Sequence, residues 1–556
     1  MKTPVIAIGL DATEPSLIEE WIAAGQLPAL ARLRATGSYQ RLQNQGYYRA
    51  ETPWTSFLTG CSPETTGYWG PVKYHADRYD VEKVGAYKYN NFLPFYALND
   101  DFKSAIFDMP QTALMPVFNG VQVLAWGAHS PQVARGSQPA SLLNDLVNQF
   151  GVHPAFGRDH ANIYSQKSIT RLQKWLETGI ARRGEICNHL LQSDDYDFLL
   201  TVFGEAHAAG HYMWHLNEAA HPLYGEQITA GNNLLLSVFK SIDAAINHII
   251  EAASPETSVV VFSAHGMQNN NLDVTSTFFL AELLYRWNFP AKVGFAANAN
   301  GSRRQPVSGK AARQRWYRQI WAQKHDPNPL TRFWRAQLPT KGHRILEQLG
   351  SRLGYRATSD FVSPYALQNS GGAFDWQPAT WYKPVWPQMK AFALPSFSEG
   401  YIRINLKGRE PNGLVAPESY DAVCQELIEQ LNCLKNGRTH QPVVDRIIRT
   451  RTRANQADQG LPDADLIVMW NEEHLADIVE SPTLGSIGPV PYQRSGSHTP
   501  HGFVLMNGPN VEAGESVSTG SALDLAPTLL DLMGAPIPDY FEGQSLLPQR
   551  SLTAIA

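Results

Sequence analysis

Four histidines and one aspartate occupy positions that suit metal ligands. His207 and His211 lie in the segment FGEAHAAGHYMWH, just after the apolar run 196–203. His265 follows the run SVVVF, His498 precedes the run FVLM, and Asp11 ends the N-terminal run VIAIGLD. Imidazole and carboxylate groups together form the ligand set of zinc and also suit iron or manganese. These residues therefore predict a metal site.

The apolar runs beside these residues are typical of buried parallel strands. Ligands of an open α/β sheet bind outside the carboxyl ends of its strands, so polar residues at several strand ends are expected to converge. Strands alternate with helices along the first 270 residues, which predicts an α/β fold with a doubly wound, mostly parallel sheet. The expected strands are 5–9, 104–108, 120–126, 198–203 and 259–262, and the expected helices are 16–36, 53–59, 170–192 and 232–252.

The middle of the chain has a different composition. Residues 300–356 are rich in Arg, Lys and Trp, which indicates basic, aromatic helices inserted into the sheet order. The region predicts a cap or lid with a solvated basic face; the alternative is an electropositive wall for an anionic substrate or a membrane surface. Strand and helix patterns return after it. We therefore expect a core of residues 1–290 and 395–556 with an inserted helical and loop cap at 291–394.

Composition excludes several classes of function. The chain has 556 residues, 43% of them hydrophobic and 17% charged, and a formal net charge of −5, which gives no drive toward nucleic acid. Its four cysteines are widely spaced, as in reduced proteins. No apolar stretch is long enough to span a bilayer, and the N-terminal run is too short for a signal peptide. We expect a cytoplasmic protein, with its oligomeric state left open.

Six segments, in chain order, carry a family likeness. They are VIAIGLDAT, TPWTSFLTGCSPETTGYWG, FGEAHAAGHYMWH, FSAHGM, GSHTPHGFVLMNGP and DLAPTLLDLMGAPIPDYFEGQSL. Together they resemble the alkaline phosphatase superfamily, in its type I phosphodiesterase and nucleotide pyrophosphatase branch, over residues 4–270 and 400–548. The resemblance implies an alkaline-phosphatase-like core and hydrolysis or transfer at a phosphodiester, monoester or nucleotide pyrophosphate.

The same resemblance implies two divalent metal ions, zinc first, with iron or manganese as alternatives. In the family, two zinc ions clamp the phosphoryl group while a metal-bound Thr or Ser attacks phosphorus. Carried onto this sequence, Asp11, His265 and either Thr52 or Glu51 would bind one ion, and His207, His211 and His498 the other. Glu205 is a further candidate, either as a ligand or as a residue that orients His207.

The sequence departs from the family pattern at three places. Ala264 replaces the Asp that precedes His265, which removes an oxygen ligand. His207 replaces an Asp, which removes a negative charge. The nucleophile segment is also shorter than usual: counting back from Thr59 places Ala50 at the nucleophile position, one deleted residue places Glu51 there, and two place Thr52 there.

Two interpretations of the short segment follow. Thr52 precedes Pro53 at a predicted helix N-terminus, where backbone N–H groups favour bound phosphate, and we favour it as the nucleophile. Alternatively, Glu51 is a metal ligand that restores the carboxylate lost at position 264. Thr55 is an outside candidate. If the altered ligands change the chemistry, the alternatives are non-phosphoryl metal catalysis or a non-catalytic anion-binding protein.

Overall fold

The computed structural model forms two compact units. It describes residues 4–98, 100–127, 133–219, 221, 223–224, 233–295, 316–325, 342, 361–509, 511–515 and 519–548. The first unit comprises Met1–Gly70, Gly85–Gln268 and Ser495–Ala556, and the second comprises Pro71–Val84 and Asn269–Arg494. Among the described residues, no helix has the length and apolar character needed to cross a membrane.

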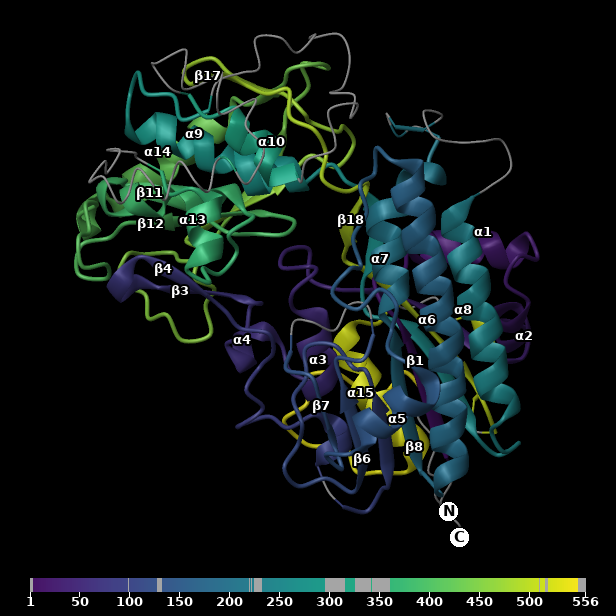
Figure 1. Ribbon diagram of the computed structural model, residues 1–556. Helices are drawn as coiled ribbons and strands as arrows, with labels where there is room; N and C mark the ends of the chain where they lie inside the picture. Colours follow the sequence, from purple (N-terminus) through teal and green to yellow (C-terminus); the bar gives the residue numbers. More distant parts are fainter. Residues whose placement is uncertain are drawn as a thin grey trace. The chain divides into compact units, whose positions relative to one another are not determined.

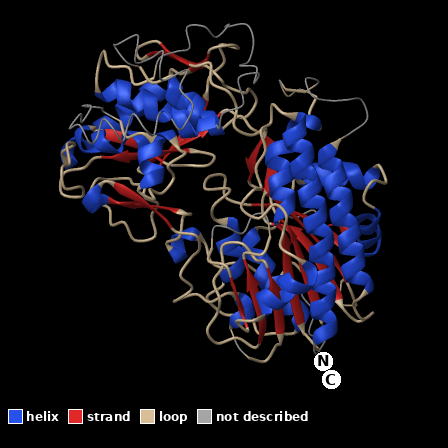
Figure 2. Cartoon of the chain, in the orientation of Figure 1, coloured by secondary structure: helices blue, strands red, loops and turns tan. Residues whose placement is uncertain are grey.

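A nine-stranded sheet forms the centre of the first unit, in the order β20-β2-β19-β9-β1-β8-β5-β6-β7 (Figures 1 and 2). The strands are β1 Val5–Leu10, β2 Ser38–Gln43, β5 Ser104–Phe107, β6 Gly120–Leu124, β7 Gly136–Gln138, β8 Phe198–Phe203, β9 Ser258–Ser263, β19 His501–Asn507 and β20 Gly514–Glu515. Strands β9, β1, β8, β5 and β6 are parallel, whereas β19 and β7 run antiparallel to their neighbours. The predicted mostly parallel sheet is confirmed.

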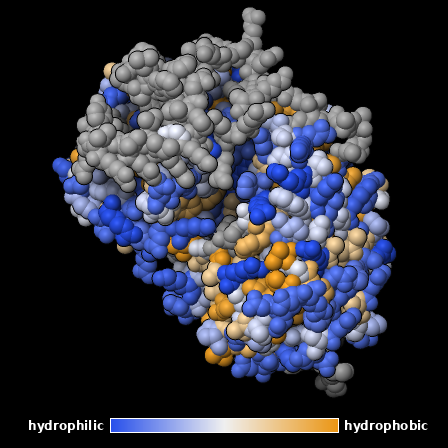
Figure 3. All heavy atoms as spheres, in the orientation of Figure 1, coloured by the Kyte–Doolittle hydropathy of each residue, from blue (hydrophilic) through white to orange (hydrophobic). Residues whose placement is uncertain are grey.

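Helices cover both faces of this sheet. They are α1 Pro15–Ala23, α2 Pro28–Thr36, α3 Pro53–Thr59, α4 Pro63–Thr66, α5 Leu142–Phe150, α6 Gln166–Ser193, α7 Gly204–Met213, α8 Leu234–Glu251 and α15 Leu525–Met533. Alternate residues of β1 enter different cores: Ile6 and Ile8 pack with α1, α2 and α5–α8, while Val5 and Ala7 pack with α3 and α15. This period of two is expected of a strand buried on both faces. Polar residues cover much of the face drawn in Figure 3.

The predicted elements of the first unit lie close to the observed ones, with one correction. Residues 16–36 form two helices, α1 and α2, not the single helix predicted. Gly25 adopts a positive φ of 69° after the end of α1, and Pro28 begins α2. A left-handed glycine ends a helix, and a proline at the first turn starts one, so the apolar period simply resumes after the break.

The second unit has its own small sheet, in the order β11-β12-β15-β14. These strands are β11 Ala391–Leu394, β12 Gly400–Ile404, β15 Leu466–Trp470 and β14 Val444–Arg449, packed with α9 Leu280–Asn288 and α14 Tyr420–Asn432. The unit also contains the hairpin β3 Val72–His75 and β4 Asp80–Lys83. The predicted cap at 291–394 falls within this wider unit. Most of the basic region 300–356 lies outside the described residues; α10 Trp316–Ala322 is described.

Candidate metal centre

The carboxyl ends of three adjacent parallel strands bring the predicted site residues to one edge of the sheet. Strand β1 lies between β9 and β8, in parallel register with both. Asp11 follows β1, α7 follows β8 directly, and His265 follows β9. The hydroxyl of Ser263 donates to the carbonyls of Leu10 and His265 at 2.7 and 2.8 Å, which ties the ends of β1 and β9 together.

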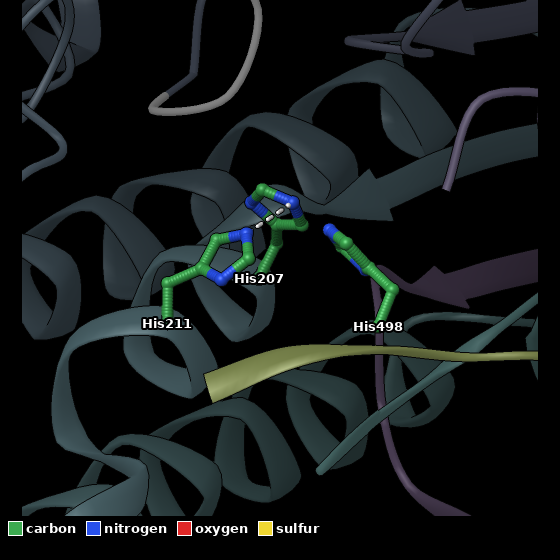
Figure 4. A group of neighbouring side chains, drawn as sticks. All are labelled: His207, His211 and His498. Carbon is green, nitrogen blue, oxygen red and sulfur yellow. Dashed lines mark hydrogen bonds between the residues drawn. The ribbon is translucent and has the colours of Figure 1, made fainter. Parts of the chain in front are cut away.

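His207, His211 and His498 form a triad whose ligand atoms all lie within 4.8 Å of one another (Figure 4). His207 and His211 are one turn apart on α7, so both imidazoles project from the same face of the helix. His498 comes from β18 Gly496–Thr499, and all three side chains are buried. The Nε2 atoms of His207 and His211 are 3.1 Å apart. Two ligands of a tetrahedral zinc ion lie about 3.3 Å apart, so the triad fits such an ion.

Gly496 allows β18 to approach α7, and Gly210 leaves space for the Met267 side chain. A Cβ atom on Gly496 would lie 2.3 Å from the carbonyl oxygen of Gly210, and one on Gly210 would lie 2.9 Å from the Met267 side chain. The carbonyl of Gly496 accepts a 2.7 Å hydrogen bond from Nδ1 of His211. That bond fixes the imidazole tautomer and leaves Nε2 as the metal-binding atom, the usual arrangement for a histidine ligand.

Asp11 and His265 lie beside the triad as a pair. Their Oδ1 and Nε2 atoms are 3.8 Å apart, and the imidazole of His265 is 4.9 Å from that of His498 between ring centroids. Asp11 Oδ1 also accepts a 3.2 Å hydrogen bond from the indole of Trp54, whose ring meets His265 edge-on. The methyl group of Ala264 packs in the apolar layer with Trp54. The two predicted residues are therefore close together, in a different setting from the triad.

The predicted nucleophile segment forms the start of α3. Thr52 is its N-cap residue, and the Thr52 hydroxyl donates to the carbonyl of Tyr48 at 3.0 Å. The buried Glu51 carboxylate accepts a 3.0 Å hydrogen bond from the backbone N–H of Ala50. The hydroxyl of Thr55, in the first turn, is buried and makes no hydrogen bond with the residues that the structure describes. Glu51, Thr52 and Thr55 are therefore close together in the chain, and their side chains differ in hydrogen bonding.

Glu205 belongs to a buried ionic cluster instead of the triad. Its Oε1 atom accepts hydrogen bonds from Arg183 Nε at 3.2 Å and from His153 Nε2 at 3.1 Å. Arg183 also donates to Asp108 at 2.8 Å. Because the backbone N–H of Ala155 donates to His153 Nδ1, the imidazole proton lies on Nε2. The Arg183 cluster, comprising Arg183, Asp108, Glu205 and His153, therefore places two carboxylates around one guanidinium group.

Burial would by itself raise the pKa of the Glu205 carboxyl, but Arg183 and His153 lower it below its ordinary value. Burial lowers the pKa of Arg183, but Glu205 and Asp108 outweigh it and raise that pKa. A carboxylate on the first turn of α7 also interacts favourably with the helix dipole. The cluster anchors the start of the helix that carries His207 and His211.

Sequence reasoning did not identify Arg183, Asp108 or His153. One signal was present: Arg183 falls within the apolar stripe of α6, between Ile180 and Cys187, where a buried arginine needs an acidic partner. His215, one turn beyond His211, is also buried, and its Nδ1 atom lies 3.0 Å from the Ser495 hydroxyl.

Comparison with known proteins gives a family match and several distant likenesses. The family model described as type I phosphodiesterase/nucleotide pyrophosphatase matches residues 5–322. Arylsulfatase K of Canis lupus familiaris is 47% identical over 49 residues, which are 9% of this chain and 9% of that protein.

Among solved structures, phosphonoacetate hydrolase from Sinorhizobium meliloti 1021, in complex with phosphonoformate, is 12% identical with a TM-score of 0.46, over 96% of each chain. Murine ectonucleotide pyrophosphatase/phosphodiesterase 5 is 10% identical with a TM-score of 0.47, over 97% of this chain and 96% of that chain. Alkaline phosphatase PafA is 12% identical with a TM-score of 0.46, over 98% of each chain.

Proposed function

The chain belongs to the type I phosphodiesterase/nucleotide pyrophosphatase family, and we propose that it hydrolyses a small anionic phosphate ester with a divalent metal ion held by His207, His211 and His498. The observation that carries the proposal is the convergence of these three buried imidazoles within 4.8 Å. Imidazole ligands suit zinc best among the ions expected, with iron and manganese as the alternatives. The family resemblance implies a second ion at Asp11 and His265.

A bound ion supplies Lewis-acid polarisation of a phosphoryl oxygen. The chain's own residues hold and orient the reacting groups. His211 is fixed by the carbonyl of Gly496 at 2.7 Å, and α7 is anchored through Glu205 and Arg183. The buried imidazoles place the phosphate ester in a partly desolvated setting, where electrostatic interactions are stronger than in water.

We propose Thr52 as the group that attacks phosphorus. Its hydroxyl donates to the carbonyl of Tyr48, so attack requires rotation about the Cα–Cβ bond and loss of the hydroxyl proton. As the Thr52–phosphorus bond forms, the bond from phosphorus to the ester oxygen breaks, and the leaving alcohol takes up a proton. Water then cleaves the phosphothreonine and regenerates the hydroxyl. The alternative role for this segment is that Glu51 ligates a metal ion. Mutation separates these roles. Thr52→Ala removes the nucleophile and keeps every imidazole and carboxylate ligand, whereas Glu51→Gln lowers metal content only if the carboxylate is a ligand.

The test is hydrolysis of bis(p-nitrophenyl) phosphate and p-nitrophenyl phosphate by metal-stripped protein supplied with zinc, iron or manganese. We expect hydrolysis of at least one ester with at least one ion, and its loss in His498→Ala. The matched control is His501→Ala, which removes an exposed histidine from the same segment and should retain activity.

The outcomes also distinguish the alternatives. Metal bound at the triad without hydrolysis of either ester would refute phosphate ester hydrolysis and favour other metal chemistry. Saturable binding of inorganic phosphate without turnover would favour a non-catalytic anion-binding protein. Equal hydrolysis by His498→Ala and the parent protein would show that the triad has no part in the reaction.

A further inference from the structure

We propose that Glu14 is a positioning residue of the candidate metal centre. Its carboxyl group accepts a 3.0 Å hydrogen bond from the hydroxyl of Thr499, the residue that follows His498. This contact lies against the backbone of Gly266, the residue that follows His265. The hydrogen bond sets the place of His498 in the triad, so the inference rests on the proposed function in taking His498 as a metal ligand.

The turn after β1 directs Glu14 toward the end of β9. Ala12 is buried in a left-handed backbone conformation with a φ of 53°, which residues other than glycine rarely adopt. The N–H of Thr13 donates at 3.0 Å to the hydroxyl of Ser263, which also joins the ends of β1 and β9. Glu14 is the next residue and directly precedes α1. A strained backbone of this kind persists only where its surroundings hold it, so the turn fixes the point from which the Glu14 side chain starts.

Gly266 leaves the space in which the two side chains meet. A Cβ atom at this position would lie 2.5 Å from a carboxyl oxygen of Glu14 and 2.5 Å from the hydroxyl oxygen of Thr499. Any other residue would therefore displace the pair. The Thr499 hydroxyl also accepts a 3.4 Å hydrogen bond from the backbone N–H of His501, and its own proton goes to Glu14. Thr499 is buried, and a hydrogen bond shielded from water is electrostatically stronger than one at the surface.

Strand β18 is held at both ends, with His498 between them. At one end, Gly496 approaches α7, and its carbonyl accepts the hydrogen bond from Nδ1 of His211. At the other end, Glu14 holds Thr499. Successive side chains of a strand point to opposite sides, so Thr499 can be held from behind while His498 projects toward the other two histidines (Figure 4). The restraint on Thr499 therefore fixes the backbone that carries the His498 imidazole.

Asn44 makes a separate connection between the segments that contain His265 and His498. Its side-chain amide donates to the carbonyls of Ala264 at 2.5 Å and Pro500 at 3.2 Å. These bonds hold the backbone of both segments without involving Glu14. Because they remain when Glu14 is replaced, the loss should appear in the position of the imidazole ligand and not in the folding of this region.

The zinc affinity of the full-length protein, measured by competition with a chelator, tests the inference. Glu14→Ala should weaken zinc binding about 10- to 100-fold, the range expected when a group that orients a ligand is lost. Thr499→Val removes the hydroxyl at nearly constant volume and should have the same effect. Glu14→Gln keeps an acceptor oxygen and should stay within about fivefold of the parent protein, since a hydrogen bond to an amide is weaker than one to a carboxylate. Glu20→Ala, an exposed change on α1, is the matched control and should leave the affinity unchanged.

Two further measurements separate positioning of the ligand from a general loss of structure. Adding Thr499→Val to Glu14→Ala should weaken zinc binding no further, because both changes remove the same hydrogen bond. With cobalt bound in place of zinc, the visible absorption bands report the ligand geometry. They should shift in Glu14→Ala and stay unchanged in Glu20→Ala.

The outcomes distinguish this inference from the proposed function. Parent affinity in Glu14→Ala, or additive losses in the double variant, would overturn the inference and leave the proposed function intact. A parent protein that binds no zinc would overturn both. If Glu14→Ala does not fold, Thr499→Ser and Thr499→Val decide: the serine variant keeps the hydroxyl and should retain the affinity, and equal losses in the two variants would overturn the inference.

Discussion

Replacing Arg183 by methionine should destabilise the first unit and loosen the histidine triad of the candidate metal centre. The side chain is fully buried on α6, with ion pairs to Asp108 at 2.8 Å and Glu205 at 3.2 Å. At an effective dielectric constant of about 20, these distances correspond to gross attractions of roughly 6 and 5 kcal/mol. Desolvation of the charges offsets most of this sum. Methionine fills similar space but leaves two buried carboxylates without their cation.

Removal of one partner from a buried ionic group costs about 3–5 kcal/mol, and the upper part of that range is expected because two carboxylates lose their cation. The chain contains two units, so its unfolding is not expected to be a single step. Hydrogen exchange of peptides from α6 and α7 therefore reports the local loss. Arg171→Met, an exposed change on the same helix, is the control and should cost less than about 1 kcal/mol.

A second variant separates charge from packing. The triple variant combines Arg183→Met, Asp108→Asn and Glu205→Gln and removes all three of these buried charges. More than half of the stability lost in Arg183→Met should return. Zinc affinity should fall about 10- to 100-fold in Arg183→Met, because the start of α7 is released. A loss below about 1 kcal/mol with unchanged zinc affinity would refute the argument. A triple variant less stable than Arg183→Met would show that packing, not charge, is decisive.

The remaining predictions concern the site and a buried histidine. Gly496→Ala places a Cβ atom 2.3 Å from the Gly210 carbonyl, so zinc affinity measured by competition with a chelator should fall at least tenfold; an unchanged affinity contradicts the close approach. Thr52→Ala should abolish ester hydrolysis with normal zinc content while Thr55→Ala retains it, and the reverse result identifies Thr55 as the nucleophile. Burial and a second histidine lower the pKa of His221 to about 3 from an ordinary 6.5. The unfolded chain therefore binds the proton first, and stability should fall by up to about 1.4 kcal/mol per pH unit as the pH drops from 6.5 toward 3. Urea unfolding at several pH values should show a smaller slope in His221→Gln, and an equal slope would refute this assignment.

Local sequence patterns predicted the strands and the closeness of His207 and His211, because each signal lies within one short segment. The role of these histidines as metal ligands stays a prediction. The runs 198–203 and 259–262 are buried on both faces, so their residues are almost all apolar. The i, i+4 spacing of His207 and His211 fixes their relation on a helix without any tertiary information. His498 needed the family motif, because its segment is about 290 residues away in the chain.

Other features depend on contacts between distant residues. Glu205 is of a residue type that can ligate a metal ion. Its carboxylate instead accepts hydrogen bonds from Arg183 and His153, which lie far from it in the chain. Gly179 leaves space for His153, because a Cβ atom at this position would lie 1.8 Å from the imidazole. No sequence pattern shows which of two nearby polar surfaces a helical glutamate will contact. The helix break near residue 25, by contrast, was present in the sequence as Gly25 and Pro28.

The charge of the candidate metal centre would follow from the residues that this chain has retained. Replacing an aspartate by His207 and another by Ala264 removes two negative charges from the arrangement that the family resemblance implies. A divalent ion bound by three neutral imidazoles keeps its full double charge, whereas a carboxylate ligand would neutralise part of it. Anionic substrate and anionic product are both attracted by the uncompensated charge. A divalent ion at the triad would therefore favour an anionic ligand more strongly than an ion with a carboxylate ligand would.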